Sequence, residues 1–357
     1  MKTVKFAIIG GGWRTEFYTR IAQALPERFT ICGAYIRSTE KRTIFSQKWS
    51  VPGYDAIDKM ISDTKPEFIV VSVPRPAVYS ILKILAEKKI PVLTETPPAD
   101  TLAELIELNN LVKTGARIQV AEQYIFQPIH AARLNIIRSG KLGSITQAQV
   151  SACHGFHGVS LIRYFLGIRF ENPVISAYKF VSKIVKGSSR MGHPLKEEIV
   201  NSSQVIARLE FNGKLGIFDF TPDQYMSWVR SPRVLIRGEK GEINNDTVRY
   251  LKTFNEPVEA DLKRMQAGED GNLEGFYHKG ILMGNEWVYG NPFIPARLSG
   301  DEIAVASSLQ KMSEYADGGD EFYSAAEASQ DHYIAMMIDK SVESGELVRT
   351  ERQMWGT

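Results

Sequence analysis

Short apolar runs alternate with amphipathic segments along the first third of the chain. Residues 4–9 are almost wholly apolar, as a parallel strand that is buried on both faces requires. Residues 16–25 place Phe17, Ile21 and Leu25 at helical spacing and predict a helix. The alternation continues, with strands predicted at 29–36, 68–73, 91–94 and 117–121 and helices ending at 49 and covering 56–61, 78–87 and 102–113. This order predicts a parallel, doubly wound sheet over residues 1–122.

Beyond residue 122 the pattern becomes richer in strands. A helix is predicted at 129–139, and strands are predicted at 144–151, 177–185, 202–211, 214–221 and 233–238. The segment Phe211-Asn212-Gly213-Lys214 is typical of a hairpin turn, so antiparallel pairing is expected. Helical spacing returns over 325–344, and this helix is expected to pack back on the first domain. The sequence therefore predicts an α/β protein with two domains, residues 1–122 and 123–357.

The composition excludes several classes of function. The chain has 357 residues, 43% of them hydrophobic, and a formal charge of +2. It contains no basic block that could follow a phosphate backbone, so nucleic acid is not an expected partner. No apolar run approaches the roughly 20 residues that span a bilayer, and the first strand leaves no room for a signal peptide, so we expect a cytoplasmic protein without a membrane partner. Cys32 and Cys153 form no disulfide framework and are expected to be reduced.

The first predicted strand runs directly into a glycine turn, Gly10-Gly11-Gly12. Glycines are required where the chain turns tightly and its backbone approaches a pyrophosphate at the start of a helix. The turn predicts a dinucleotide site, but the usual third glycine is Thr15, so a plain strand-turn-helix is the alternative. Trp13 could equally pack between the domains. The residues expected to contact the cofactor here are Gly10, Gly12, Trp13 and Arg14.

The end of the second predicted strand bears on the choice of cofactor. An acidic residue normally binds the ribose 2′-hydroxyl of NAD there, but this chain has Ile36, followed by Arg37, Ser38 and Thr39. Because no carboxylate repels a 2′-phosphate, Arg37 and Ser38 can bind that phosphate through hydrogen bonds. NADP is therefore favoured, with NAD as the alternative. A role for Ser38 or Thr39 as a helix cap is compatible with this interpretation.

Four segments together resemble the Gfo/Idh/MocA oxidoreductases, the family of glucose-fructose oxidoreductase and inositol dehydrogenase. They are the glycine turn, Val73-Pro74 in place of the family's Thr-Pro, residues 93–97 (Leu-Thr-Glu-Thr-Pro) and residues 157–167. The resemblance implies an N-terminal Rossmann domain and a C-terminal α+β domain whose open, mainly antiparallel sheet forms a homodimer or homotetramer. It also implies NAD(P)-dependent oxidation of a sugar or polyol. The cofactor-binding residues that it adds are Val73, Pro74, Glu95 and Gln123.

The departures from the family pattern concern the catalytic groups. The family's Glu-Lys-Pro is Glu95-Thr96-Pro97 here, so the lysine that helps to move the reaction proton beside the nicotinamide is missing. Thr96 can position a substrate but cannot act as an acid or base near neutral pH. The family's His-x-x-Asp becomes His157-x-x-Ser160, and Cys153 replaces an aspartate four residues before the histidine. We retain Glu95 and Thr96 as candidate catalytic residues.

The segment Cys153-His154-Gly155-Phe156-His157 contains the other catalytic candidates. The preferred hypothesis makes His157 the general acid/base that faces the nicotinamide, with His154 as a substitute or helper, because imidazole titrates near neutral pH. One histidine could instead cap or pack at a helix start. A metal site is not favoured, because catalytic zinc normally needs three protein ligands and no matching group stands out elsewhere in the chain.

These observations predict an NAD(P)-dependent oxidoreductase that transfers hydride from a carbohydrate or polyol while a base takes the hydroxyl proton. Two other functions remain open at this point. The bound cofactor could oxidise a sugar transiently and permit elimination or glycosidic cleavage without net redox change. Alternatively, the chain could be a non-catalytic sensor that binds a dinucleotide or a sugar.

Overall fold

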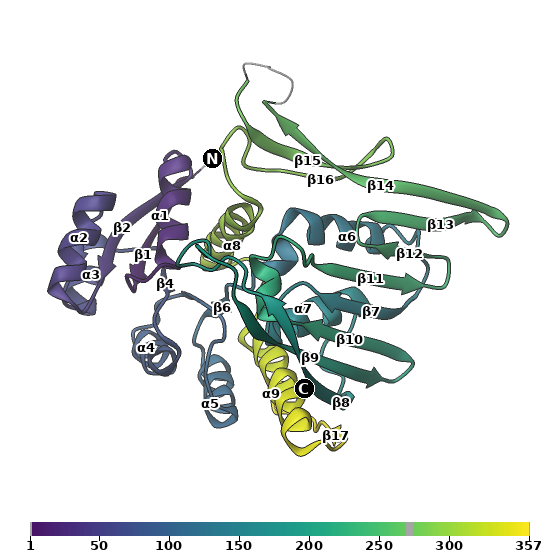
Figure 1. Cartoon of the computed structure of the whole chain (residues 1–357). Helices are drawn as coiled ribbons and strands as arrows, with labels where there is room; N and C mark the ends of the chain where they lie inside the picture. The colour runs from purple at the N-terminus through teal and green to yellow at the C-terminus, as the bar shows by residue number, and fades with distance from the viewer. Residues whose placement is uncertain (1, 269–273, 357) are drawn as a thin grey trace. The chain divides into compact units, whose positions relative to one another are not determined.

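The computed structural model describes residues 2–268 and 274–356 (Figure 1). Contacts between residues divide the chain into two compact units. The first comprises Met1–Pro128, Met265–Gly280 and Gly290–Ser329, and the second comprises Ile129–Arg264, Ile281–Tyr289 and Gln330–Thr357. The domain boundary at residue 122 stays a prediction.

The first unit contains a six-stranded parallel sheet with the order β3-β2-β1-β4-β5-β6. Its central strands are apolar on both faces, and Phe6, Ile8 and Val70 have no exposed surface, because helices cover a parallel sheet on both sides. The strands are β1 (Val4–Ile9), β2 (Phe29–Tyr35), β3 (Gly53–Tyr54), β4 (Phe68–Val71), β5 (Val92–Thr94) and β6 (Ile118–Val120). The predicted Rossmann-type sheet is confirmed.

Six α-helices and a short 3-10 helix accompany these strands in the first unit. They are α1 (Thr15–Ala24), α2 (Thr39–Trp49), α3 (Ile57–Thr64), α4 (Arg75–Glu87), α5 (Leu102–Lys113), η1 (Tyr124–Phe126) and α8 (Gly300–Ala316). Helix α5 begins with a complete capping box formed by Thr101 and Glu104. The sequence analysis did not predict α8, although Ser299 and Glu302 form the same type of box at its start.

A second sheet of eleven strands has the order β16-β15-β14-β13-β12-β11-β7-β10-β9-β8-β17. It is mainly antiparallel, as expected, and the predicted hairpin is confirmed because Phe211 pairs with Lys214. Its strands are β7 (Ile145–Ser151), β8 (Val174–Val185), β9 (Ile199–Phe211), β10 (Lys214–Phe220), β11 (Arg233–Gly238), β12 (Gly241–Asn244), β13 (Thr247–Thr253), β14 (Glu256–Ala267), β15 (Tyr277–Met283), β16 (Glu286–Gly290) and β17 (Val348–Arg349).

One pairing in this sheet differs from the expected antiparallel arrangement, because β7 and β10 are parallel. The chain leaves β7 through helix α7 (Gly155–Leu166) and passes through β8 and β9 before it reaches β10, which gives the long crossover connection that parallel strands require. Helix α7 packs closely on this part of the sheet, since a Cβ on Gly216 would lie 2.6 Å from the Ile162 side chain. The remaining helices are α6 (Pro128–Arg138), η2 (Pro222–Tyr225) and α9 (Ala325–Ser344).

None of the helices in residues 2–268 and 274–356 is both long and apolar enough to cross a membrane.

Candidate functional site

The glycine turn lies at the carboxyl end of β1, and its glycines have different structural roles. Gly10 has a φ of +130°, and a Cβ at this position would lie 2.0 Å from the carbonyl oxygen of Ser72. Gly10 is therefore required for the close approach of β1 to the segment after β4. Gly12 is different, because a Cβ built on it would meet nothing within 4 Å. The open space above Gly12 is where a ligand could approach the backbone.

Helix α1 begins without a side-chain cap. Arg14 occupies the N-cap position, but its side chain makes no capping hydrogen bond. Within residues 2–268 and 274–356, the backbone N–H groups of Gly11 and Gly12 donate to no acceptor. Unsatisfied N–H groups at the positive end of a helix suit an anion such as a pyrophosphate. Thr15, in place of the third glycine, is fully buried and does not cover this end.

Trp13, the other residue predicted to contact the cofactor here, is 54% exposed. Its ring packs edge-on against Phe17, with 5.7 Å between the ring centroids. The predicted role over the pyrophosphate stays a prediction.

The end of β2 carries cations rather than a carboxylate. Ile36 is 5% exposed and lies against the glycine turn, because a Cβ on Gly11 would come within 2.9 Å of its Cδ1 atom. Ser38 is the N-cap of α2, since its hydroxyl accepts a hydrogen bond from the Lys41 N–H at 3.3 Å. Arg37 is exposed and forms no hydrogen bond within the part of the chain that the structure describes.

Arg42 is a second cation at the end of β2, and the sequence analysis did not identify it. Its guanidinium donates to the Ile36 carbonyl at 2.9 Å and to the Thr39 hydroxyl at 3.2 Å. These bonds fix its position beside Ile36.

A charged network lies at the carboxyl end of β5. Glu95 accepts hydrogen bonds from Arg14 Nε at 2.8 Å and from the Tyr18 hydroxyl at 2.5 Å. Arg14 also forms an ion pair with Asp301, at 3.5 Å between Nη1 and Oδ2. Arg14 and Glu95 were both predicted to contact the cofactor, and the structure joins them directly.

The pKa values in this network follow from burial and charge. Burial is the largest single influence and opposes the positive charge of Arg14, but Glu95, Tyr18 and Asp301 together outweigh it, so the pKa of Arg14 is raised. Burial, reinforced by Glu95, also raises the pKa of Tyr18 well above its usual value. Both side chains therefore keep their protons, and Arg14 is a permanent cation that cannot act as an acid or base. It does not reproduce the chemistry of the missing lysine.

Thr96 follows Glu95 directly and is half-buried, and its peptide bond to Pro97 is cis. Val73 and Pro74 follow β4, where Val73 packs partly buried against the core of the first unit. Pro74 is exposed and is the N-cap of α4. These segments end adjacent strands of the sheet.

Glu122 lies two residues beyond the end of β6 and is 1% exposed. Its Oε1 atom accepts a hydrogen bond from the Tyr124 N–H at 3.1 Å. Burial raises the pKa of Glu122 to about 8, and the charges of Glu95 and Asp301 act in the same direction. Glu122 is therefore mostly protonated at neutral pH.

Gln123, predicted to bind the cofactor, is 8% exposed, and its Oε1 atom is buried without a hydrogen-bond partner in the described part of the chain. The Nη2 atom of Arg14 is also buried without a hydrogen-bond partner in the described part of the chain. Buried polar atoms are normally paired by protein or water, so these two are free to bind a ligand.

The two histidines that were predicted to be catalytic lie in the second unit, at the start of α7. His154 is its N-cap, and its backbone N–H donates to the Tyr225 hydroxyl at 3.0 Å. The same hydroxyl lies 2.6 Å from His154 Nδ1. A hydroxyl has a single proton, so donation to Nδ1 would leave the neutral ring protonated at Nε2.

His157 is 5% exposed and surrounded by aromatic rings. Its ring lies 4.9 Å from that of His154 and 4.5 Å from that of Phe156, measured between centroids. Cys153 and Ser160, which replace the family's acidic residues, are fully buried. The structure thus brings the two histidines together with Tyr225.

Comparison with known proteins identifies the domain that carries the glycine turn. Residues 4–122 match the model of an oxidoreductase family with an NAD-binding Rossmann fold. This segment is therefore similar to the NAD-binding domain of the Gfo/Idh/MocA oxidoreductases. The chain is also similar to an uncharacterised oxidoreductase of Schizosaccharomyces pombe, 27% identical over 152 residues, and to the putative oxidoreductase YteT of Bacillus subtilis, 24% identical over 165 residues.

These matches span only part of each protein. They cover 41% and 45% of this chain, and 41% and 36% of the two relatives. The whole fold has a counterpart in the solved structure of levoglucosan dehydrogenase with NADH and levoglucosan, which is 17% identical. That comparison covers 99% of this chain and 100% of the other, with a TM-score of 0.71. The two proteins share a fold.

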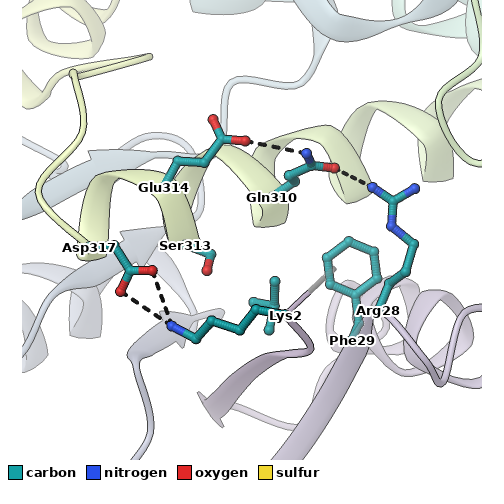
Figure 2. A pocket seen from close by; sticks show the side chains of 8 residues that line it. Lys2, Arg28, Phe29, Gln310, Ser313, Glu314 and Asp317 are labelled. Atoms are coloured by element: carbon teal, nitrogen blue, oxygen red, sulfur yellow. Dashed lines mark hydrogen bonds and ion pairs between the residues drawn. The ribbon is translucent and has the colours of Figure 1, made fainter.

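The first unit also has a pocket of about 170 Å³ at the amino end of its sheet (Figure 2). Its charged groups are already paired, since Lys2 binds Asp317 at 3.1 Å and Gln310 binds Glu314 at 3.3 Å. Dinucleotides bind at the carboxyl end of such sheets, so this pocket is separate from the candidate cofactor site. The pocket is lined by Lys2, Val4, Arg28, Phe29, Gln310, Ser313, Glu314 and Asp317.

Within residues 2–268 and 274–356, no group of three or more histidine, cysteine, aspartate or glutamate side chains could hold a metal ion.

Proposed function

We propose that this protein is an NAD(P)-dependent oxidoreductase that transfers hydride to or from a CH–OH group of a sugar or polyol. The observation that carries the proposal is the pair of N–H groups of Gly11 and Gly12, which donate to no acceptor in the described residues, beside the open space at Gly12 and the uncapped start of α1. It lies at the carboxyl end of β1, where the order β3-β2-β1-β4-β5-β6 reverses direction. Dinucleotides bind at such a reversal.

The cofactor we propose is NADP. Ile36 is apolar, so no carboxylate opposes a 2′-phosphate, and the exposed Arg37 supplies a cation. Arg42 adds a second guanidinium that is held beside the Ile36 carbonyl. Ser38 is occupied as the cap of α2, so its contribution would come from its backbone rather than from a free hydroxyl. Charge-assisted bonds from arginine are the strongest contacts available to a phosphate.

His157, with His154, would exchange the proton of the substrate hydroxyl. The network of Arg14 and Glu95 would position the substrate or the nicotinamide ribose, with Thr96 as an additional hydroxyl group. When bound, the nicotinamide ring supplies the hydride acceptor. The levoglucosan complex of the structurally similar dehydrogenase supports an anhydrosugar, sugar or polyol as the substrate class.

We also propose a homodimer or homotetramer formed through the second sheet. Tyr178 and Phe180 lie two residues apart on β8, hence on the same face, and are 57% and 52% exposed. Light scattering after size exclusion should give a dimer or tetramer, and replacement of both residues by glutamate should lower the mass. A monomer at micromolar concentration would contradict this proposal.

The function is tested by titrating the purified protein with NADPH and NADH and following nicotinamide fluorescence. We expect NADPH to bind more tightly. A panel of sugars and polyols is then screened for cofactor reduction, and His157→Asn and the double variant with His154→Asn are assayed on any substrate found. Turnover should fall by about 10²-fold or more if these groups transfer the proton. Failure to bind either cofactor would refute the function as a whole.

A further inference from the structure

Three carboxyl groups lie near one guanidinium at the carboxyl edge of the first sheet, and two of them are paired with it. Glu95 follows β5 and Glu122 follows β6, and the two strands are neighbours because the Ala121 N–H donates to the Thr94 carbonyl at 2.8 Å. Asp301 comes from the first turn of α8. Arg14 is the cation paired with Glu95 and with Asp301.

This arrangement places an excess of negative charge around Glu122. With all three carboxyl groups ionised, Arg14 would neutralise one of them and two negative charges would remain close together. Like charges at short range favour retention of a proton by one group of the set. Glu122 is the most deeply buried of the three. It is therefore the group that keeps the proton, and its pKa of about 8 agrees with this.

The strand order indicates which part of the cofactor would lie near this group. In a sheet of this order the two mononucleotide halves bind on either side of the reversal between β1 and β4. The glycine turn takes the pyrophosphate, and β2 takes the ribose of the adenosine half. The nicotinamide half then lies over the ends of β4, β5 and β6, where Glu95 and Glu122 are located.

The oxidised nicotinamide ring carries a positive charge that the reduced ring lacks. A cation beside Glu122 stabilises its carboxylate and lowers its affinity for a proton, whereas the neutral reduced ring does not. We propose that Glu122 is a redox-linked proton store: it holds a proton in the free protein and with NADPH, and it releases that proton when NADP⁺ binds. The inference rests on the proposed cofactor binding but not on any particular substrate.

The proton balance of a catalytic cycle follows from this assignment. Oxidation of a CH–OH group transfers one hydride to NADP⁺ and frees one proton from the hydroxyl. As the nicotinamide loses its positive charge, Glu122 regains its affinity for a proton and takes up one. Glu122 takes up the equivalent of the proton that the substrate hydroxyl loses, so the hydride-transfer step itself releases no net proton to solution. The one proton that the overall reaction produces is the proton that Glu122 released earlier, when NADP⁺ bound. Glu122 therefore acts through charge and need not touch the substrate.

Calorimetry of the unsubstituted protein tests the proposal without an assay of activity. NADP⁺ and NADPH are titrated at about pH 7.5 in phosphate and in Tris, whose ionisation enthalpies differ. The buffer dependence of the binding enthalpy gives the protons exchanged, and we expect release approaching one proton for NADP⁺ and nearly none for NADPH. Equal proton exchange for the two cofactors would overturn the proposal.

The variant Glu122→Gln identifies the group that releases the proton. In the unsubstituted protein, the affinity for NADP⁺ relative to NADPH should rise with pH up to about pH 8, by at most tenfold per pH unit, because both cofactors carry the same phosphates. In Glu122→Gln this ratio should be independent of pH. Glu107→Gln, which removes a carboxylate on α5 that bonds Tyr79, is the matched control and should keep the original profile. An unchanged profile in Glu122→Gln would refute the assignment.

The outcomes separate this inference from the proposed function. If neither dinucleotide binds, the function fails. If NAD binds in place of NADP, the same measurements are made with NAD⁺ and NADH. If a cofactor binds but its oxidised and reduced forms exchange the same number of protons, the proposed role of Glu122 is refuted and the proposed function is not.

Discussion

The two ends of the candidate cofactor edge differ in how they hold charge. At the end of β2, Arg37 is exposed and Arg42 is held by two hydrogen bonds to neutral groups. At the ends of β5 and β6, Arg14, Glu95 and Glu122 are largely removed from water and act on one another. Exposed charges are screened and can be exchanged at little structural cost, whereas buried charges must be balanced. The β2 end is therefore suited to discriminate between NADP and NAD, and the β5 and β6 end is suited to hold and release a proton.

The largest effect is expected from the glycine turn that separates these two ends. Gly10→Ala forces a Cβ to within 2.0 Å of a carbonyl oxygen at a φ of +130°, so unfolding free energy should fall by about 3 kcal/mol or more. Gly12→Ala is the matched control, because its Cβ meets nothing within 4 Å. It should remain as stable as the original in urea but lose cofactor affinity. Equal destabilisation of both variants would contradict the different roles of the two glycines.

Removal of the guanidinium should show that the β5 end depends on charge balance. Arg14→Met leaves Glu95 and Asp301 without their shared cation, and the loss of one partner from a buried pair costs about 3 kcal/mol. Urea unfolding measures this loss. Combining it with Glu95→Gln should recover part of the stability, since one uncompensated charge is removed. If the double variant were less stable than Arg14→Met, charge imbalance would not be the cause.

The pH dependence of stability should also distinguish the buried end. Because the pKa of Glu122 is about 8 in the folded protein and near 4.5 when exposed, the folded state binds more protons between these values. Its contribution to stability therefore decreases as pH rises through this interval, by up to about 1.4 kcal/mol per pH unit. Glu122→Gln should flatten the dependence measured by urea unfolding from pH 6 to 8. A slope identical to that of the original protein would argue against the buried acid.

The smallest effect is expected at the exposed β2 end. Arg37→Ala should weaken NADPH binding by about tenfold, which corresponds to about 1.4 kcal/mol, and should leave NADH binding and thermal stability nearly unchanged. Fluorescence titration measures both affinities. Lys41→Ala, one helical turn away in sequence, is a control for the loss of an exposed positive charge. A similar weakening by both substitutions would indicate general electrostatic attraction rather than a specific contact.

Local patterns predicted much of the fold. The boundaries of α5 and α9 agree with the sequence, because periodic apolar positions and a capping box mark them. Strands β13, β14 and β16 were missed because one or both of their faces are exposed, so their side chains do not follow the apolar pattern expected of buried strands. Helix α8 carries small and apolar residues on several faces, which obscured its period even though Ser299 and Glu302 mark its start.

The candidate site was only partly predictable. A glycine turn is a local pattern of a few residues, so the sequence alone was enough to predict the candidate cofactor site at the end of β1. The bond between Arg14 and Glu95 joins residues 81 positions apart, and no local pattern indicates such a pair. Similarly, the high pKa of Glu122 arises from burial and from charges on other elements, none of which the neighbouring residues reveal.

The return of α8 to the first unit has a consequence for protein synthesis. Asp301 pairs with Arg14 across 287 positions, and Glu302 binds Arg20 at 2.7 Å across 282. Asp301 and Glu302 are synthesised long after β1 to β6. Until then, Arg14 and Arg20 of the nascent chain lack these two ion-pair partners. A chain cut after residue 128 would lack both acids. Although the first helix is among the first parts of the chain to be synthesised, it is therefore among the last to reach its final surroundings.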